Sequence, residues 1–92
     1  MLTLGHLTGN TNEIAVKAVV IDSRQARDAS VFYAFQGERV DGHAYVPTAF
    51  AQGAIAAIVE RPIPSARMVA PEQVAALTPA DLPVAILVPS TL

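Results

Sequence analysis

The apolar run Val31-Phe32-Tyr33-Ala34-Phe35-Gln36 predicts a β-strand, because it is rich in aromatic and β-branched residues. Polar residues flank this run. Asp22-Ser23-Arg24 ends the strand-like run before it, and Gly37-Glu38-Arg39-Val40-Asp41-Gly42-His43 follows it directly. If the two strands lie side by side in one sheet, their polar ends form a single rim with a hydroxyl, two guanidiniums, an imidazole and two glycines. Such a rim suits an anionic, hydrogen-bonding ligand such as a nucleoside diphosphate.

The rest of the chain alternates between strand-like and helical patterns. A short helix and loop open it, and β-branched runs predict three further strands at 14–21, 54–59 and 84–88. The segment 64–70 is expected to be irregular, and 71–77 to form one or two helical turns. The predicted fold is therefore α/β: a small single domain with a mixed β-sheet of about four or more strands flanked by helices, including at least one right-handed crossover.

One helix is predicted at 45–52, directly after the second polar stretch. Its apolar residues have the spacing of one helical face: Val46, Ala49 and Phe50. Pro47 fits the first turn, and Gly53 fits the position just past the end. We expect this helix to pack on the sheet.

Composition limits the classes of function. The 92 residues are 52% hydrophobic and 15% charged, which fits one folded domain with a single core. The net charge of −2 and the scattered basic residues argue against nucleic acid as a partner. With no cysteine and two histidines, a metal site is not expected. Since no apolar run is long enough to span a membrane and no signal peptide is recognisable, we expect no membrane insertion and a cytoplasmic location.

Each polar residue also has a purely structural interpretation. Asp22-Ser23-Arg24 alone is a common strand-terminating turn, and Asp41-Gly42 alone is a turn signal. His43 either contacts a ligand, caps the following helix or donates to a backbone carbonyl. Asp41 either binds a ribose or holds its own loop closed, and loop-holding is favoured. The case for a binding site rests on the two stretches occurring together, in order.

The chain resembles the N-terminal domain of the Mur ligases. The resemblance lies in three segments: Val20-Ile21-Asp22-Ser23-Arg24, residues 31–43, and Ala49-Phe50-Ala51-Gln52-Gly53-Ala54. Members of that family add amino acids to the UDP-linked peptidoglycan precursor. The ending Ile86-Leu87-Val88-Pro89-Ser90-Thr91-Leu92 looks more like the ligase that adds D-alanyl-D-alanine than like the tripeptide ligase.

The resemblance implies that residues 1–92 form a substrate-anchoring domain for the UDP end of UDP-N-acetylmuramoyl-peptide. The family's UDP-lining residues map to Ser23, Arg24, Gly37, Glu38, Arg39, Val40, Asp41, Gly42 and His43. The alternatives are a stand-alone nucleotide-sugar binding module and a protein-interaction domain without a ligase parent.

Two departures from the family pattern matter. Ala29-Ser30 replaces the usual Gly-Asp pair, and because alanine is strained at positive φ we expect the linker 25–30 to follow a different path. The chain also has no Gly-Lys-Thr phosphate loop. We therefore expect no catalytic residue and no cofactor here. ATP and Mg²⁺ would belong to the parent enzyme, whose central ATP-binding domain and C-terminal domain are absent and whose central domain would be this domain's partner.

Overall fold

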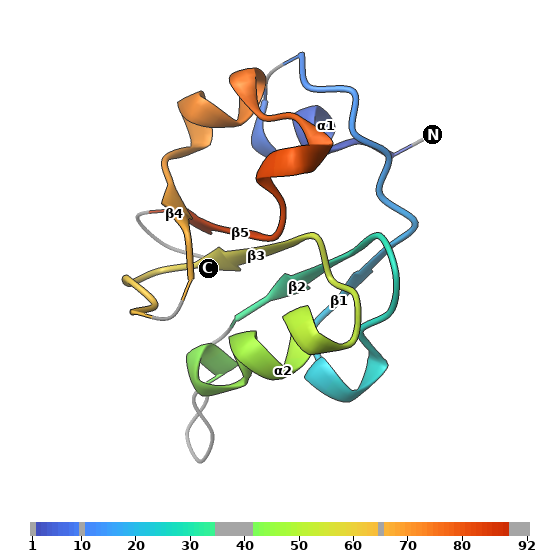
Figure 1. Cartoon of the computed structure of the whole chain (residues 1–92), viewed down its shortest axis with the longest axis vertical. Helices are drawn as coiled ribbons and strands as arrows, with labels where there is room; N and C mark the ends of the chain where they lie inside the picture. The colour runs from blue at the N-terminus through green and yellow to red at the C-terminus, as the bar shows by residue number, and fades with distance from the viewer. Residues whose placement is uncertain (1, 10, 35–41, 65, 89–92) are drawn as a thin grey trace.

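The computed structural model describes residues 2–9, 11–34, 42–64 and 66–88. Five parallel strands form one sheet in the order β1-β2-β3-β5-β4 (Figure 1). Their bounds are β1 Ala18–Val20, β2 Ser30–Tyr33, β3 Ala56–Val59, β4 Met68–Val69 and β5 Val84–Leu87. The helices are α1 Leu4–Thr8, α2 Val46–Ala51 and the 3₁₀ turns η1 Ser23–Gln25, η2 Gly42–Tyr45, η3 Pro71–Ala76 and η4 Pro79–Asp81.

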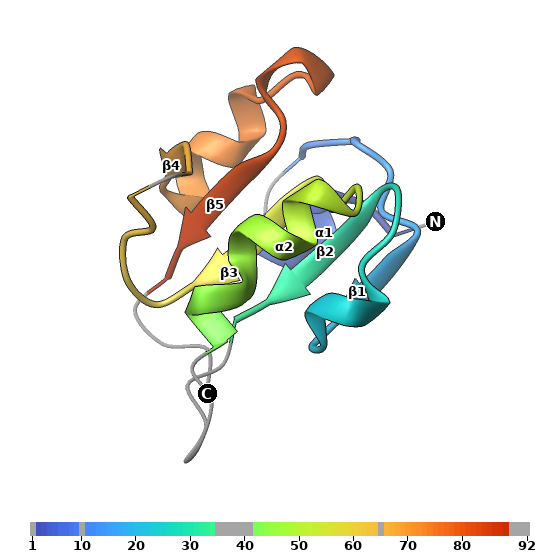
Figure 2. The ribbon, with the colours of Figure 1, turned by 60° about the horizontal axis from the view of Figure 1, so that its bottom comes forward.

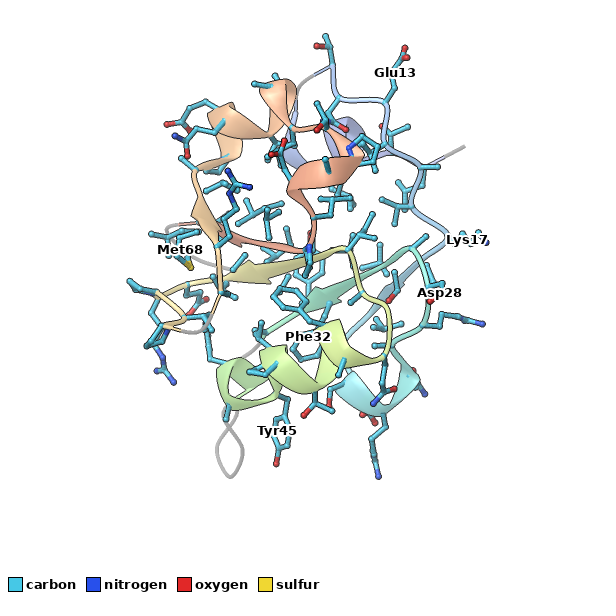
Figure 3. All side chains as sticks on the ribbon, viewed as in Figure 1. Glu13, Lys17, Asp28, Phe32, Tyr45 and Met68 are labelled. Atoms are coloured by element: carbon cyan, nitrogen blue, oxygen red, sulfur yellow. The ribbon has the colours of Figure 1, made fainter. Side chains whose placement is uncertain are left out.

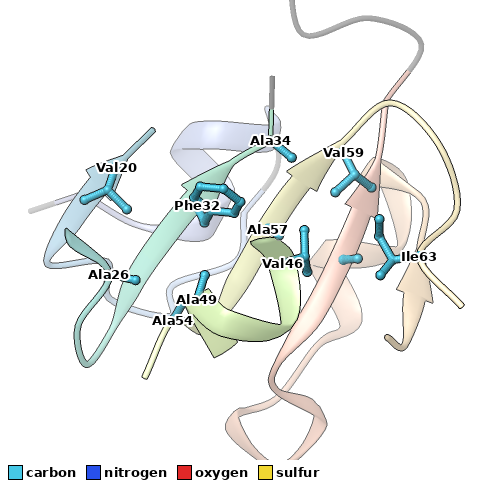
Figure 4. Packing of buried hydrophobic residues seen from close by; sticks show 11 residues of the cluster. Val20, Ala26, Phe32, Ala34, Val46, Ala49, Ala54, Ala57, Val59 and Ile63 are labelled. Carbon is cyan, nitrogen blue, oxygen red and sulfur yellow. The ribbon is translucent and has the colours of Figure 1, made fainter. Parts of the chain in front are cut away.

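Helices cover both faces of the sheet. α2 and η1 lie on one face, and α1, η3 and η4 lie on the other (Figures 1 and 2). Successive strand residues face opposite sides of the sheet, and each face has its own cluster of buried residues. Phe32 packs in the cluster on the face covered by α2, which we call the α2 cluster, while Val31 and Tyr33 pack in the cluster on the opposite face. Figures 3 and 4 show Phe32 between the sheet and α2. Double coverage explains why these strands are nearly continuous apolar runs.

Two strand connections that contain helices lie on opposite faces of the sheet. The β2 to β3 connection passes through η2 and α2, whereas the β4 to β5 connection passes through η3 and η4. The chain crosses the sheet in one direction from β1 to β4 and steps back only from β4 to β5, which lies between β3 and β4. In open α/β sheets, ligands bind outside the carboxyl ends of the strands.

The α/β class and the strand positions are confirmed, and three details differ from the sequence prediction. The sheet is parallel between all described strands rather than mixed. The segment 64–70 is not wholly irregular, because it contains β4. The strand predicted at 14–21 is shorter, because Ile14 and Val16 hydrogen-bond to Leu4 and Leu2 of the N-terminal segment instead of to β2.

The helix prediction is confirmed in its main features. α2 has Pro47 in its first turn, and Gly53 follows its end with φ of 106°. A Cβ at Gly53 would lie 2.9 Å from the backbone nitrogen and the Cα of Asp28, so the close approach itself requires glycine. The loop before β2 is thereby packed directly against the end of α2.

The linker 25–30 does not avoid the left-handed turn, contrary to the prediction. Ala29 has φ of 61°. Hydrogen bonds on both sides hold it there: its N–H donates to the Gly53 carbonyl at 3.2 Å, and its carbonyl accepts from Lys17 N–H at 2.8 Å. The buried Ser30 hydroxyl closes the same turn by donating to the Arg27 carbonyl at 2.7 Å. These contacts outweigh the strain at alanine, which costs about 1–2 kcal/mol.

Candidate functional site: the carboxyl edge of the sheet

Parallel strands bring the residues that follow them to one edge of the sheet. Here these residues are Asp22–Arg24 after β1, Gly42–His43 after β2 and Glu60–Pro64 after β3, which we call the carboxyl edge. The first two groups were predicted from the sequence as one rim. The remaining predicted residues of the second polar stretch, Gly37, Glu38, Arg39, Val40 and Asp41, lie outside the described residues.

Asp22 and Arg24 form a local unit at the end of β1. The Asp22 carboxylate caps η1 by accepting from Arg24 N–H at 2.9 Å, and it also accepts from the Arg24 guanidinium at 2.8, 3.1 and 3.2 Å. These hydrogen bonds hold the pKa of the Asp22 carboxyl below its ordinary value. The Arg24 side chain is 87% exposed, so it retains outward-facing donors for an anion.

Arg24 in η1 and Tyr45 at the end of η2 belong to two turns that both contact α2. The hydrogen bond to Asp22 raises the pKa of Arg24, and the phenol of Tyr45 raises it further. Tyr45 projects away from the sheet beneath η2 and α2 (Figure 3). That the first polar stretch and the second form one rim stays a prediction.

Ser23 is less accessible than the sequence implied. It is buried within η1, and its carbonyl accepts from Ala26 N–H at 3.2 Å. With its side-chain nitrogen turned toward η1, the Gln52 amide donates to the carbonyls of Ala26 and Ser23 at 3.1 and 3.3 Å. This turn is thus fastened to the C-terminal end of α2, which fixes Ser23 relative to the rim.

His43 has a role that none of the sequence alternatives described. Its side chain is only 4% exposed, and its Nε2 accepts a hydrogen bond from Glu60 N–H at 2.9 Å. A nitrogen that accepts this bond carries no proton, so the imidazole is neutral. His43 therefore joins the loop after β2 to the loop after β3.

A groove of about 300 Å³ opens beside His43. One wall is formed by His43, Ala44 and Pro47, and the other by the segment from Arg61 to Pro64. The sequence analysis treated this second segment only as the end of a strand. The reasoning that grouped the first two stretches, that polar residues at the ends of neighbouring strands form one rim, applies equally to β3 and would have found it.

Within the described ranges, no group of three or more His, Cys, Asp or Glu side chains is placed to hold a metal ion. Of the helices in those ranges, none combines the length and the apolar character needed to cross a membrane.

Comparisons with known proteins connect the chain to a family. A family profile described as "Mur ligase family, catalytic domain" matches residues 15–84. The diaminopimelate-adding ligase of Bacteroides fragilis, named UDP-N-acetylmuramoyl-L-alanyl-D-glutamate--2,6-diaminopimelate ligase, is 44% identical over 54 residues, which are 59% of this chain and 11% of that protein. The UDP-N-acetylmuramoyl-tripeptide--D-alanyl-D-alanine ligase of Synechocystis sp. is 33% identical over 57 residues, 62% of this chain and 13% of that protein.

Solved structures of ligases of the same kind are also similar to this chain. The UDP-N-acetylmuramoylalanyl-D-glutamyl-2,6-diaminopimelate--D-alanyl-D-alanyl ligase from Acinetobacter baumannii superposes with a TM-score of 0.54 at 35% identity, over 67% of this chain and 15% of that one. The chain thus corresponds to little more than a tenth of the length of the curated relatives it matches. With the profile covering most of its residues, the chain belongs to the Mur ligase family.

Proposed function

We propose that this chain is the N-terminal, substrate-anchoring domain of a cytoplasmic ATP-dependent ligase of peptidoglycan synthesis, and that it binds the UDP end of a UDP-N-acetylmuramoyl-peptide. One observation carries the proposal. The chain is similar to ligases that add different groups, 2,6-diaminopimelate in one case and D-alanyl-D-alanine in another. The names of these relatives share the UDP-N-acetylmuramoyl part of the substrate, so a region common to both kinds of ligase is suited to that shared part.

The carboxyl edge has the chemistry such a role needs. Arg24 offers charged donors to a diphosphate, and Gly42 allows the backbone to approach a ligand. Binding the distant, unreactive end of the substrate orients the carboxyl group that reacts elsewhere. The anchoring domain would therefore contribute to the rate without contacting the reacting atoms.

The chain's own residues do not fit ATP, because no Gly-Lys-Thr phosphate loop occurs in the 92 residues. We assign ATP and Mg²⁺, which would activate the peptide carboxylate as an acyl phosphate, to the rest of the ligase. Its central domain would then be the partner of this one.

The first prediction concerns UDP binding by the 92-residue chain. We expect Kd values from millimolar to high micromolar, equivalent to about 4–6 kcal/mol, since most substrate contacts lie elsewhere. Titrating UDP into ¹⁵N-labelled protein should shift amide signals at residues 22–24 and 37–45. Arg24→Ala should weaken binding about twofold to fivefold, because an exposed charged donor is lost and the Asp22 carboxylate is left facing the anion.

The matched control is Arg27→Ala, which removes the same charge from the exposed loop before β2, at the opposite edge of the sheet. It should leave the affinity for UDP unchanged. Absence of any UDP-dependent shift at millimolar ligand would contradict the proposed function.

A further inference from the structure

β1 is an edge strand that carries neither a charge nor a proline. It stands at the end of the order β1-β2-β3-β5-β4, so no described strand lies beyond it (Figure 2). Sheets ordinarily protect their edges with charged side chains, proline or very short strands. At the opposite edge, β4 has only two residues and Pro71 follows it closely. β1 reads Ala18-Val19-Val20, and the apolar Ile21 continues it.

The main-chain groups on the outer side of β1 point away from the sheet. Val16 N–H turns outward to the Leu2 carbonyl at 2.9 Å, whereas Lys17 N–H turns inward to the Ala29 carbonyl, directly before β2, at 2.8 Å. Main-chain groups alternate in this way along a strand, and the backbone stays extended as far as Asp22, with φ of −113° and ψ of 120°. Outward N–H groups therefore recur at residues 18, 20 and 22.

Two exposed apolar side chains border this outer side. Val19 is 40% exposed and Ile21 is 70% exposed. Val19 pairs in register with Val31, so both side chains belong to the face opposite α2, where Val31 is buried and they are not. Val20, between them, is buried in the α2 cluster. Outward main-chain groups beside uncovered β-branched side chains are the two features with which an added strand would pair.

This edge is complementary to itself. In an antiparallel pair, outward-pointing residues meet outward-pointing residues, so a two-fold axis at Val20 sets Val20 opposite its own copy and Ala18 opposite Asp22. Val19 then lies opposite Ile21 of the second copy. The two exposed side chains of each copy would thus cover those of the other, on the same face of the joined sheet.

We propose that β1 pairs with β1 of a second copy of this chain in antiparallel orientation, which joins two five-stranded sheets into one. Lys17 falls opposite Ser23 of the second copy, so no like charges meet directly. The paired stretch 18–22 is about 17 Å long and one strand deep, which buries far less than the roughly 800 Å² per partner of a standard interface. The association is therefore weak and reversible, with a Kd of about 0.1–1 mM. It is independent of the proposed function.

The first test varies the concentration of the 92-residue chain. Sedimentation equilibrium should give a monomer at about 0.01 mM and a mixture of monomer and dimer at about 1 mM. Over the same range, hydrogen exchange should slow at the amides of residues 18, 20 and 22, which point outward. It should not change at residues 19 and 21, which face β2 at every concentration. In a half-labelled sample, a nuclear Overhauser effect between Val19 of one copy and Ile21 of the other would establish the register.

The second test changes the side chains of the pair. Ile21→Lys removes the apolar cover of Val19 and adds a cation diagonal to Lys17 of the second copy, and should weaken dimerisation at least tenfold. The matched control is Leu87→Lys, the same change at an exposed apolar residue of β5, from which two strands separate β1. This control should dimerise like the unmodified chain.

A third variant tests the main chain. Ala18→Pro removes an outward N–H, which an edge strand tolerates, and should abolish dimerisation at 1 mM. Amide spectra establish that each variant is folded, and the exchange map of the unmodified chain decides the case if a variant does not fold.

A chain that stays monomeric at 1 mM would overturn the proposal, and so would equal dimerisation of Ile21→Lys and the unmodified chain. A dimer whose slowed amides lie outside residues 18–22 would place the contact on another surface and would overturn it too. UDP binding is measured separately at low protein concentration, so each of these results leaves the proposed function standing.

Discussion

Ala29 holds a backbone conformation that glycine adopts at little cost and alanine does not. Its φ of 61° is fixed by hydrogen bonds to Lys17 and Gly53, so the strain is built into the folded state. The sequence showed that alanine stands where the family usually has glycine, and the inference that the chain would turn differently was wrong. Hydrogen bonds from segments distant in sequence determined the outcome.

Ala29→Gly should stabilise the domain. Relief of left-handed strain gains about 1–2 kcal/mol, and the greater freedom of glycine in the unfolded chain returns about 0.4–1 kcal/mol. We therefore expect a net gain of roughly 0.5–1 kcal/mol in the free energy of unfolding, measured by urea denaturation.

The matched control is Ala75→Gly in η3, an exposed alanine in a helical turn. This change should lower stability by about 0.5–1 kcal/mol. A loss of stability for Ala29→Gly similar to that of Ala75→Gly would show that position 29 is not strained.

At the scale of secondary-structure elements, the hydrogen bond between His43 and Glu60 joins the loop after β2 to the loop after β3, and sequence patterns did not reveal it. The strands were predictable because Ala56–Val59 and Val84–Leu87 are apolar runs, buried on both faces except at the exposed Leu87. The carboxyl edge followed from their parallel arrangement. The His43–Glu60 hydrogen bond spans 17 residues and depends on how two loops meet, so no local pattern reports it.

The His43 connection can be tested with a pair of variants. His43→Phe keeps a ring but removes the acceptor for Glu60 N–H, and should cost about 1–3 kcal/mol of unfolding free energy. His43→Gln keeps an acceptor near the position of Nε2 and should recover part of that loss. Hydrogen exchange at the Glu60 amide should be faster in the Phe variant than in the Gln variant. Equal exchange rates and equal stabilities in the two variants would rule out this role.

For the molecule as a whole, acid should lower stability through two surface carboxylates. The Arg24 hydrogen bonds lower the pKa of Asp22, and hydrogen bonds from Thr78, followed by the charge of Arg67, lower that of Asp81. A carboxyl whose folded pKa is depressed stabilises the fold above its unfolded value, which is about 4. That contribution is lost as the pH falls through the folded-state pKa, so the loss lies below pH 4.

We expect the urea midpoint to be lower at pH 3 than at pH 6, with a small difference because both ion pairs are exposed. The double variant Asp22→Asn, Asp81→Asn should show a smaller difference between the two pH values. If the double variant keeps the full difference, these two carboxyls are not its source.

The all-parallel sheet has a consequence for how the chain folds as it is synthesised. Parallel neighbours cannot pair through a tight hairpin, so each strand waits for a crossover to bring the next one alongside. β3 sits in the middle of the sheet, yet one of its two neighbours is β5, which is made after the other four described strands. A nascent chain that has emerged only as far as Val59 therefore exposes one hydrogen-bonding edge of its central strand. The sheet closes around β3 only after residues 84–87 leave the ribosome, so folding is late and depends on contacts distant in sequence.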